Sequence, residues 1–68
     1  MAIITLTFDL DALDVIESNC IDCDIQLTND GDVMVFKRFD YEPDSWEHAA
    51  DMFNLTEVAD HIIYCEVE

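Results

Sequence analysis

Cationic side chains are almost absent from this sequence. Lys37 and Arg38 are the only two, against seventeen aspartates and glutamates, and the formal net charge is −15. A surface with this charge repels the phosphates of nucleic acids and of anionic membranes, and it attracts basic proteins. The shortage of cations therefore argues against direct binding of nucleic acid or membrane and favours a basic protein as the partner.

Glycine and proline are just as scarce, with one of each in 68 residues. No glycine-rich or proline-rich linker divides the chain, which predicts a single domain over residues 1–68. The one glycine, Gly31, follows Asp30 between two runs of alternating apolar residues. Asp-Gly in this setting strongly predicts a β-hairpin, because glycine readily adopts the positive φ that a tight turn needs.

Long hydrophobic runs and a secretion signal are also missing. No apolar stretch approaches the ~20 residues that span a bilayer, and no cationic region precedes the apolar start of the chain. Cysteine occurs in the odd number of three, which without an export signal predicts reduced thiols in a cytoplasmic protein. The hydrophobic content of 51% nevertheless predicts a folded chain.

The first elements expected are a strand over Ala2–Phe8, which is rich in β-branched residues, and a helix from Leu10 to about Cys20. Asp9 suits the N-cap of this helix. At 100° per residue the helix has one apolar and one acidic face. The apolar face comprises Ala12, Leu13, Ile16 and Cys20, and the acidic face comprises Asp11, Asp14, Glu17 and Ser18.

The hairpin follows, over residues 22–39. A two-residue turn at Asp30 and Gly31 pairs Leu27 with Met34 and Ile25 with Phe36, which predicts that these apolar partners face the core. The same register assigns the remaining side chains to a wetter face: Asp24, Gln26, Thr28, Val33, Val35 and Lys37.

A second helix and a last strand complete the expected elements. Pro43 suits the first turn of a helix that runs to about Phe53. Thr56 then caps a short turn, and residues 61–67 form an edge strand; the alternative is a further helix through Tyr64. The expected apolar stripe of the second helix is Trp46, Ala49, Ala50 and Phe53, and its polar stripe is Asp44, Glu47, His48 and Asp51.

The expected order is therefore β-α-β-β-α-β. It resembles the ferredoxin-like fold, an α+β arrangement of a four-stranded antiparallel sheet with two helices on one face. The resemblance covers the whole chain but is one of topology and pattern. Because this fold hosts many functions, function has to be argued from the side chains.

Cys20 and Cys23 have the spacing of a zinc or redox pair, and His61 with Cys65 would complete four ligands. In the expected sheet, the cysteine pair and the His61–Cys65 pair lie at opposite edges, roughly 14 Å apart at ~4.8 Å per strand. This separation argues against a shared zinc site. Neither histidine lies in a recognisable catalytic pattern. The spacing of a calcium loop is absent from the acids around the hairpin, which are Asp22, Asp24, Asp30 and Asp32. We therefore predict no enzyme, no cofactor and no metal.

The remaining sequence feature that indicates a function is the arrangement of the acidic residues. Neighbouring acids on a helix face are ~5–6 Å apart, and duplex DNA presents one charge per ~1.7 Å of axis. A rigid acidic surface thus offers a basic DNA-binding groove a comparable array of anions. The predicted partner-binding residues lie on the solvent side of the two helices and in the segment between strand and helix: Asp11, Asp14, Glu17, Asp40, Glu42, Asp44, Glu47 and Asp51.

In length, acidity, expected cysteine chemistry and lack of catalytic residues, the chain resembles the small acidic inhibitors made by bacteriophages, several of which mimic DNA. Among them it most resembles anti-CRISPR proteins that act on type I surveillance complexes. The resemblance implies a non-enzymatic inhibitor, expected to be monomeric, whose partner is a basic subunit of a CRISPR–Cas complex. It rests on no shared motif, so no site residue is transferred from that family.

Other functions fit the same composition. Proteins of extreme halophiles are acidic and poor in lysine, but they lose structure in low salt, whereas a DNA mimic should fold there. An acidic module that neutralises another basic host protein, such as a transcription factor or toxin, is a further alternative. RNA binding through Phe39 and Tyr64 on an open sheet face, as in some ferredoxin-like domains, is opposed by the net charge.

Overall fold

The centre of the molecule is strand β1 (Ala2–Phe8), in a computed structural model that describes residues 2–20 and 22–68. Its bounds are those expected from the sequence. Ile4, Leu6 and Phe8 are fully buried on one face, as predicted, while Thr5 and Thr7 alternate to the other. β1 is central because both of its edges pair, one with β3 (Val33–Phe39) and one with β4 (Ile62–Val67), both antiparallel.

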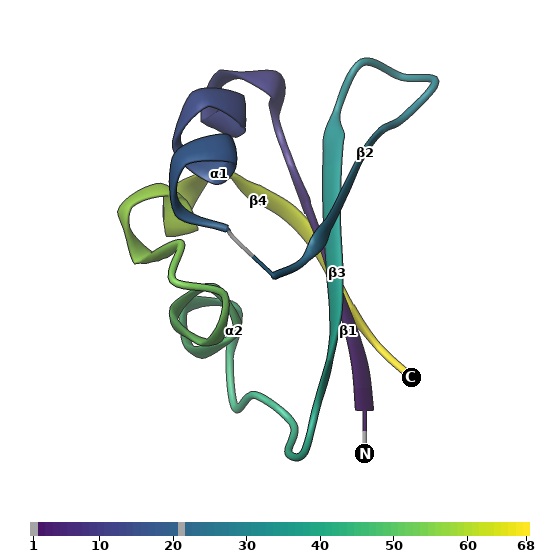
Figure 1. Cartoon of the computed structure of the whole chain (residues 1–68), viewed down its shortest axis with the longest axis vertical. Helices are drawn as coiled ribbons and strands as arrows, with labels where there is room; N and C mark the ends of the chain where they lie inside the picture. The colour runs from purple at the N-terminus through teal and green to yellow at the C-terminus, as the bar shows by residue number, and fades with distance from the viewer. Residues whose placement is uncertain (1, 21) are drawn as a thin grey trace.

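A short strand, β2 (Asp24–Leu27), pairs antiparallel with β3 and completes a four-stranded sheet in the order β2-β3-β1-β4. The helices lie on one face of this sheet and leave the other open (Figure 1). This order, with one helical segment after β1 and another after β3, fits the ferredoxin-like arrangement. The predicted α+β fold class is confirmed.

Asp9 begins the first helical segment as predicted: its Oδ1 accepts a hydrogen bond from the Asp11 N–H at 3.1 Å. The segment starts as a 3-10 helix, η1 (Leu10–Ala12), and continues as α1 (Leu13–Asn19). Ala12, Ile16 and Cys20 are buried against the sheet. The predicted apolar face is therefore the face that packs on the core.

The hairpin lies where the sequence predicts it, but its register differs by one residue. Leu27 pairs with Val33 and Ile25 with Val35, because the loop has three residues rather than two. The Thr28 hydroxyl accepts hydrogen bonds from the backbone N–H groups of Asp30 and Asp32, at 3.2 and 3.0 Å. The Thr28 N–H also bonds the Asp32 carbonyl at 2.9 Å. Gly31 follows the turn with φ +86°, the usual geometry of three-residue hairpin loops.

A shift of one residue exchanges the two faces of a returning strand. Val33 and Val35, predicted to be on the wetter face, are fully buried in the core. Met34 and Phe36, predicted to be in the core, lie on the open face and are partly exposed. On β2, every side chain is exposed, because this strand is at the edge of the sheet.

Helix α2 (Trp46–Met52) starts later than predicted. Ser45 is its N-cap, with Oγ accepting from the His48 N–H at 3.0 Å, and Pro43 precedes the helix instead of lying in its first turn. Ala49, Ala50 and Phe53 are buried as predicted. Trp46 is not: it is 46% exposed at the first position of α2.

The end of α2 sets the course of the remaining chain. Asn54 has a positive φ of 62°, the Leu55 N–H bonds the Ala50 carbonyl at 2.8 Å, and the Asn54 N–H bonds the Asp51 carbonyl at 3.0 Å. This is a Schellman helix end, and it turns the chain back against α2 as the 3-10 segment η2 (Thr56–His61). The short turn and the edge strand are confirmed, and the alternative of a helix through Tyr64 is wrong. Thr56 does not cap the turn as predicted: Leu55 is at the N-cap position, and the Thr56 hydroxyl bonds the Asp51 carboxylate at 3.3 Å.

The core lies between the helices and the sheet. Phe39 contributes to it from the end of β3, with its ring centroid 5.1 Å from that of Phe53. Phe39 therefore lies on the helix side of the sheet. Tyr64, the other aromatic residue weighed for RNA binding, lies on the open face opposite Thr7. In the described residues, no helix combines the length and apolar character needed to cross a bilayer.

Candidate functional site

The eight acids predicted to bind a partner are all solvent-exposed. Three come from the segment η1–α1, three from the loop between β3 and α2, and two from α2 itself. Both helices stand on the same side of the sheet (Figure 1). The acids are spread along the molecule, because α1 lies toward the end that carries the hairpin loop and the loop before α2 lies at the other end (Figure 1). In chain order they are Asp11, Asp14, Glu17, Asp40, Glu42, Asp44, Glu47 and Asp51.

Segment η2 adds two acids that the sequence reasoning did not include. Glu57 and Asp60 are exposed, and η2 contacts both α2 and η1. Their carboxylates therefore extend the acidic surface between the two helical segments. The sequence shows two further acids after the second helix. Their position beside α2 could not be predicted, because it depends on the Schellman turn at Asn54.

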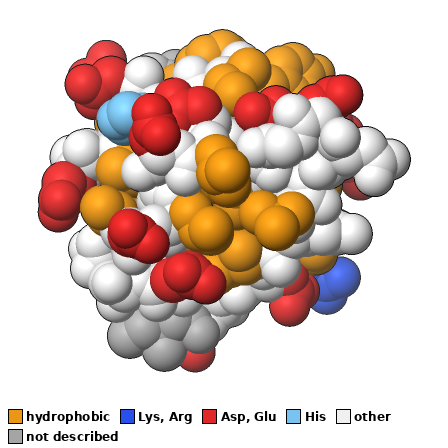
Figure 2. All heavy atoms as spheres, turned by 90° about the horizontal axis from the view of Figure 1, so that it is seen from above, with side chains coloured by type: hydrophobic (Ala, Val, Ile, Leu, Met, Phe, Trp, Pro, Cys, Tyr) orange, Lys and Arg blue, Asp and Glu red, His pale blue; other side chains and the backbone are white. Residues whose placement is uncertain are grey.

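Hydrophobic side chains are exposed at one end of the molecule. Figure 2, seen from the end of the molecule that carries α1 and the hairpin loop, shows an apolar patch with carboxylates around it. Leu10 and Leu27 belong to this end, because Leu27 pairs with Val33 and Val33 with Phe8. They are 50% and 61% exposed. The expectation that Leu27 is buried in the core is therefore wrong, because β2 is a short edge strand; Leu10 was not singled out from the sequence.

No lysine or arginine lies in the helical segments, because both are on β3. Lys37 is on the helix side of the sheet, with Nζ 5.5 Å from the centre of the Phe39 ring. Arg38 is opposite Ile3, on the open face. The carboxylates of η1, α1, α2 and η2 therefore have no lysine or arginine on their own segments to neutralise them.

Both histidines have a carboxylate near Nδ1: that of His48 lies 3.9 Å from an Asp44 oxygen, and His61 has a closer partner. The Nδ1 atom of His61 lies 3.0 and 2.9 Å from the two carboxylate oxygens of Asp9. This hydrogen bond, with the negative charges of Asp9, Asp60 and Asp11, raises the pKa of His61 above its ordinary 6.5, against a smaller opposing effect of burial. The pair ties the end of β1 to the end of η2.

The open face of the sheet is also acidic at one edge. Glu66 and Glu68 alternate to this face of β4, opposite Thr5 and Ile3. The hydrogen bond with Glu68, and then its negative charge, raise the pKa of Glu66. The sequence register had placed Val35 and Lys37 on this face beside Asp24. In the structure those two lie on the helix side, and Met34, Phe36 and Arg38 take their place.

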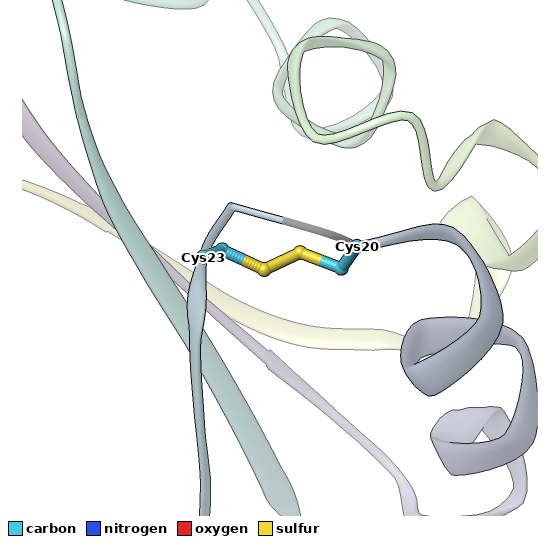
Figure 3. The surroundings of a disulfide bond; sticks show 2 residues. All are labelled: Cys20 and Cys23. Carbon is cyan, nitrogen blue, oxygen red and sulfur yellow. A yellow bond between two sulfur atoms is a disulfide. The ribbon is translucent and has the colours of Figure 1, made fainter.

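Cys20 and Cys23 form a disulfide (Figure 3). The expectation that all three cysteines are reduced is therefore wrong for this pair. Cys20 ends α1 and Cys23 precedes β2, which brings their Cα atoms to 6.0 Å, within the usual range for a disulfide. Cys65 has a free thiol whose pKa is raised by burial.

The remaining residues of the zinc hypothesis lie apart from this pair. His61 is bonded to Asp9, and Cys65 is on β4, at the opposite edge of the sheet from β2. Over residues 2–20 and 22–68, no group of three or more histidine, cysteine, aspartate or glutamate side chains is arranged to hold a metal ion. A hollow of about 200 Å³ beside the disulfide is lined by Asn19, Cys20, Asp22, Cys23, Lys37, Met52, Phe53 and Asn54.

Comparison of the chain with protein-family models, with curated proteins and with solved structures gives no match.

Proposed function

We propose that this protein is a non-enzymatic inhibitor that presents a DNA-like acidic surface to a basic nucleic-acid-binding groove. The most specific form of the proposal is an anti-CRISPR protein that blocks target DNA binding by a surveillance complex. It would act as a monomer in the cytoplasm of a bacterial host, as the product of a bacteriophage. It needs no cofactor and does not itself bind nucleic acid.

The observation that carries this proposal is the unneutralised acidic surface on the helix side. All eight acids expected there are exposed, Glu57 and Asp60 extend the set, and neither lysine nor arginine occurs in η1, α1, α2 or η2. A surface of this kind raises the rate of association with a basic protein by long-range attraction. The segments η1, α1, α2 and η2 are anchored in one core, so the backbone that carries their acids is held by the fold.

The exposed apolar side chains favour a protein partner over a surface that is acidic only for solubility. Leu10 precedes Asp11 in η1, and Leu27 lies at the same end of the sheet. Figure 2 shows that this end carries an apolar patch with carboxylates around it. An apolar centre with a charged rim is the usual composition of a protein–protein interface. A groove that normally binds DNA would meet the rim with lysine and arginine and the centre with its apolar side chains.

A competition experiment tests the proposal. The protein is titrated against labelled target DNA on a type I CRISPR surveillance complex, beside a variant in which Asp44, Glu47 and Asp51 are all replaced by lysine. We expect the parent to displace the DNA, with an effect that weakens steeply as salt is added, and the variant to fail. A parent that displaces no DNA from this complex or from any other captured nucleic-acid-binding protein contradicts the proposal.

A second variant controls for net charge alone. Replacing Asp24, Glu66 and Glu68 by lysine changes the charge by the same amount on the open sheet face. This variant should retain most of the inhibition. If the two triple variants lose inhibition equally, the helix-side surface is not the binding site; if neither does, the site lies elsewhere on the molecule.

A further inference from the structure

Trp46 is the only tryptophan of the chain, and it is exposed rather than buried. It lies at the start of α2, beside η2 and the first residue of β4. Together these elements line a hollow of about 430 Å³, formed by Trp46, Glu47, Ala59, Asp60 and Ile62. A large aromatic side chain at the surface beside two carboxylates calls for an explanation, because neither packing nor solubility requires it there.

The walls of the hollow are held by well-defined local structure. On one side, the Ser45 hydroxyl and carbonyl bond the N–H groups of His48 and Ala49, at 3.0 and 2.9 Å, which fixes the first turn of α2. On the other side, the buried side chains of Leu55 and Val58 anchor η2 in the core. The Trp46 ring and the Asp60 carboxylate therefore project from two elements whose separation is set by the fold.

The chemistry of the lining indicates what the hollow binds. Ile62 is buried and Ala59 partly so, and they provide apolar surface next to the indole ring. Glu47 and Asp60 are both exposed and add two negative charges at the rim. An indole face attracts cations, and tryptophan does so more strongly than other aromatic residues.

A long cationic side chain satisfies all these features at once. Its methylene groups cover the apolar wall, and its charged head meets the indole and the carboxylates. Arginine fits better than lysine, because its planar guanidinium stacks on an aromatic ring while its N–H groups bond carboxylate oxygens. The chain cannot supply this group from its own helical segments, since its cations are at Lys37 and Arg38 on β3.

We propose that the hollow beside Trp46 binds an arginine side chain of the basic partner protein. This proposal rests on the proposed function for the nature of the partner, and it adds a specific anchoring point to a surface otherwise described by its charge. It also accounts for the exposure of Trp46, which the amphipathic pattern of α2 does not.

The tryptophan itself reports on the site, because no other residue contributes indole fluorescence. The first experiment follows this fluorescence while a hexa-arginine peptide is added at low salt, with hexa-lysine as the comparison. We expect a saturable change with hexa-arginine at lower concentration than with hexa-lysine. Fluorescence that does not respond to hexa-arginine, or responds equally to both peptides, contradicts the proposal.

Two matched variants separate the site from the general charge. Asp60→Asn removes a carboxylate of the hollow, and Asp24→Asn removes one from β2, on the open face of the sheet; both leave Trp46 in place and change the net charge equally. We expect Asp60→Asn to weaken hexa-arginine binding by about threefold to tenfold and Asp24→Asn by less than about twofold. Equal weakening would show that the peptide binds to charge alone.

The DNA competition assay gives an independent outcome. In Trp46→Leu the indole is lost but the surface charge is unchanged, so its inhibition should fall at least about threefold below that of the parent. If the parent displaces DNA and Trp46→Leu does so equally well, the anchoring site is wrong while the proposed function stands. If the parent displaces no DNA, the proposed function fails, and the peptide titrations alone decide whether the hollow binds arginine.

Discussion

His61 and Asp9 are the residues whose interaction responds most directly to pH. They are 52 positions apart, and their side chains meet at 2.9 Å. Because the pKa of His61 is raised above 6.5 in the folded protein, the folded chain binds a proton more tightly than the unfolded chain. This stabilisation is complete below pH 6.5 and is lost as the pH rises through the higher folded-state pKa.

We therefore expect the melting temperature to fall as the pH is raised from 6 to 8. The raised pKa of Glu66 acts in the same direction at lower pH, since protonation relieves its repulsion from Glu68. His61→Gln should flatten the dependence between pH 6 and 8. An NMR titration of the imidazole checks the cause directly: its midpoint should lie above 6.5 in the parent and move down in Asp9→Asn. A parent whose stability rises over this interval would contradict the role of the pair.

At the scale of single elements, the hairpin loop depends on Gly31. Its φ of +86° is strained for any residue with a Cβ, although a Cβ there would meet no atom within 4 Å. Gly31→Val should therefore lower the free energy of unfolding by roughly 1–2 kcal/mol through backbone strain alone. Gly31→Asn should cost less, because asparagine tolerates positive φ. Urea unfolding of both variants measures this difference, and equal stabilities would show that the loop relaxes without positive φ.

The connection from α1 to β2 depends on the Cys20–Cys23 disulfide. A disulfide that closes so short a loop contributes roughly 2 kcal/mol in the chain-entropy description. Adding dithiothreitol should shift the urea midpoint of the parent and of Cys65→Ser downward, and leave that of Cys23→Ser unchanged. A parent midpoint that does not respond would mean that the disulfide adds no stability. A fold that survives reduction would also suit the proposed cytoplasmic setting, where disulfides are rare.

At the scale of the whole molecule, the net charge of −15 makes stability depend on salt, and this dependence distinguishes a DNA mimic from a halophilic protein. Self-repulsion among these carboxylates is screened within the first ~0.15 M of salt. We expect a protein that is folded at 10 mM sodium chloride, whose melting temperature rises up to about 0.15 M and changes little beyond it. Circular dichroism measures this directly. Unfolding at low salt, with recovery only in molar salt, would favour a halophilic protein and weaken the proposal of DNA mimicry.

The sequence by itself determined the order of the elements and most of their faces. β-branched alternation in Ala2–Phe8 and the 3.6-residue period of the first helix are local signals, and both faces proved correct. The predicted binding acids were exposed for a similar reason: a carboxylate without a cation on its own segment is too costly to bury. None of the eight predicted acids is buried in the structure, and Glu57 and Asp60 are exposed in addition to them.

Tertiary structure decided what local patterns leave undetermined. The hairpin register depended on one extra loop residue, held by the Thr28 hydroxyl, and that residue exchanged Val33 and Val35 with Met34 and Phe36 between the two faces. Trp46 continued the apolar stripe of α2, yet its side chain is 46% exposed at the start of the helix. The His61–Asp9 pair joins distant parts of the chain, and the Cys20–Cys23 bond depends on how the chain turns from α1 into β2. Periodicity along the chain specifies which side of a helix or strand is apolar. Which residues that side contacts, and whether it is buried, depends on how the elements pack together.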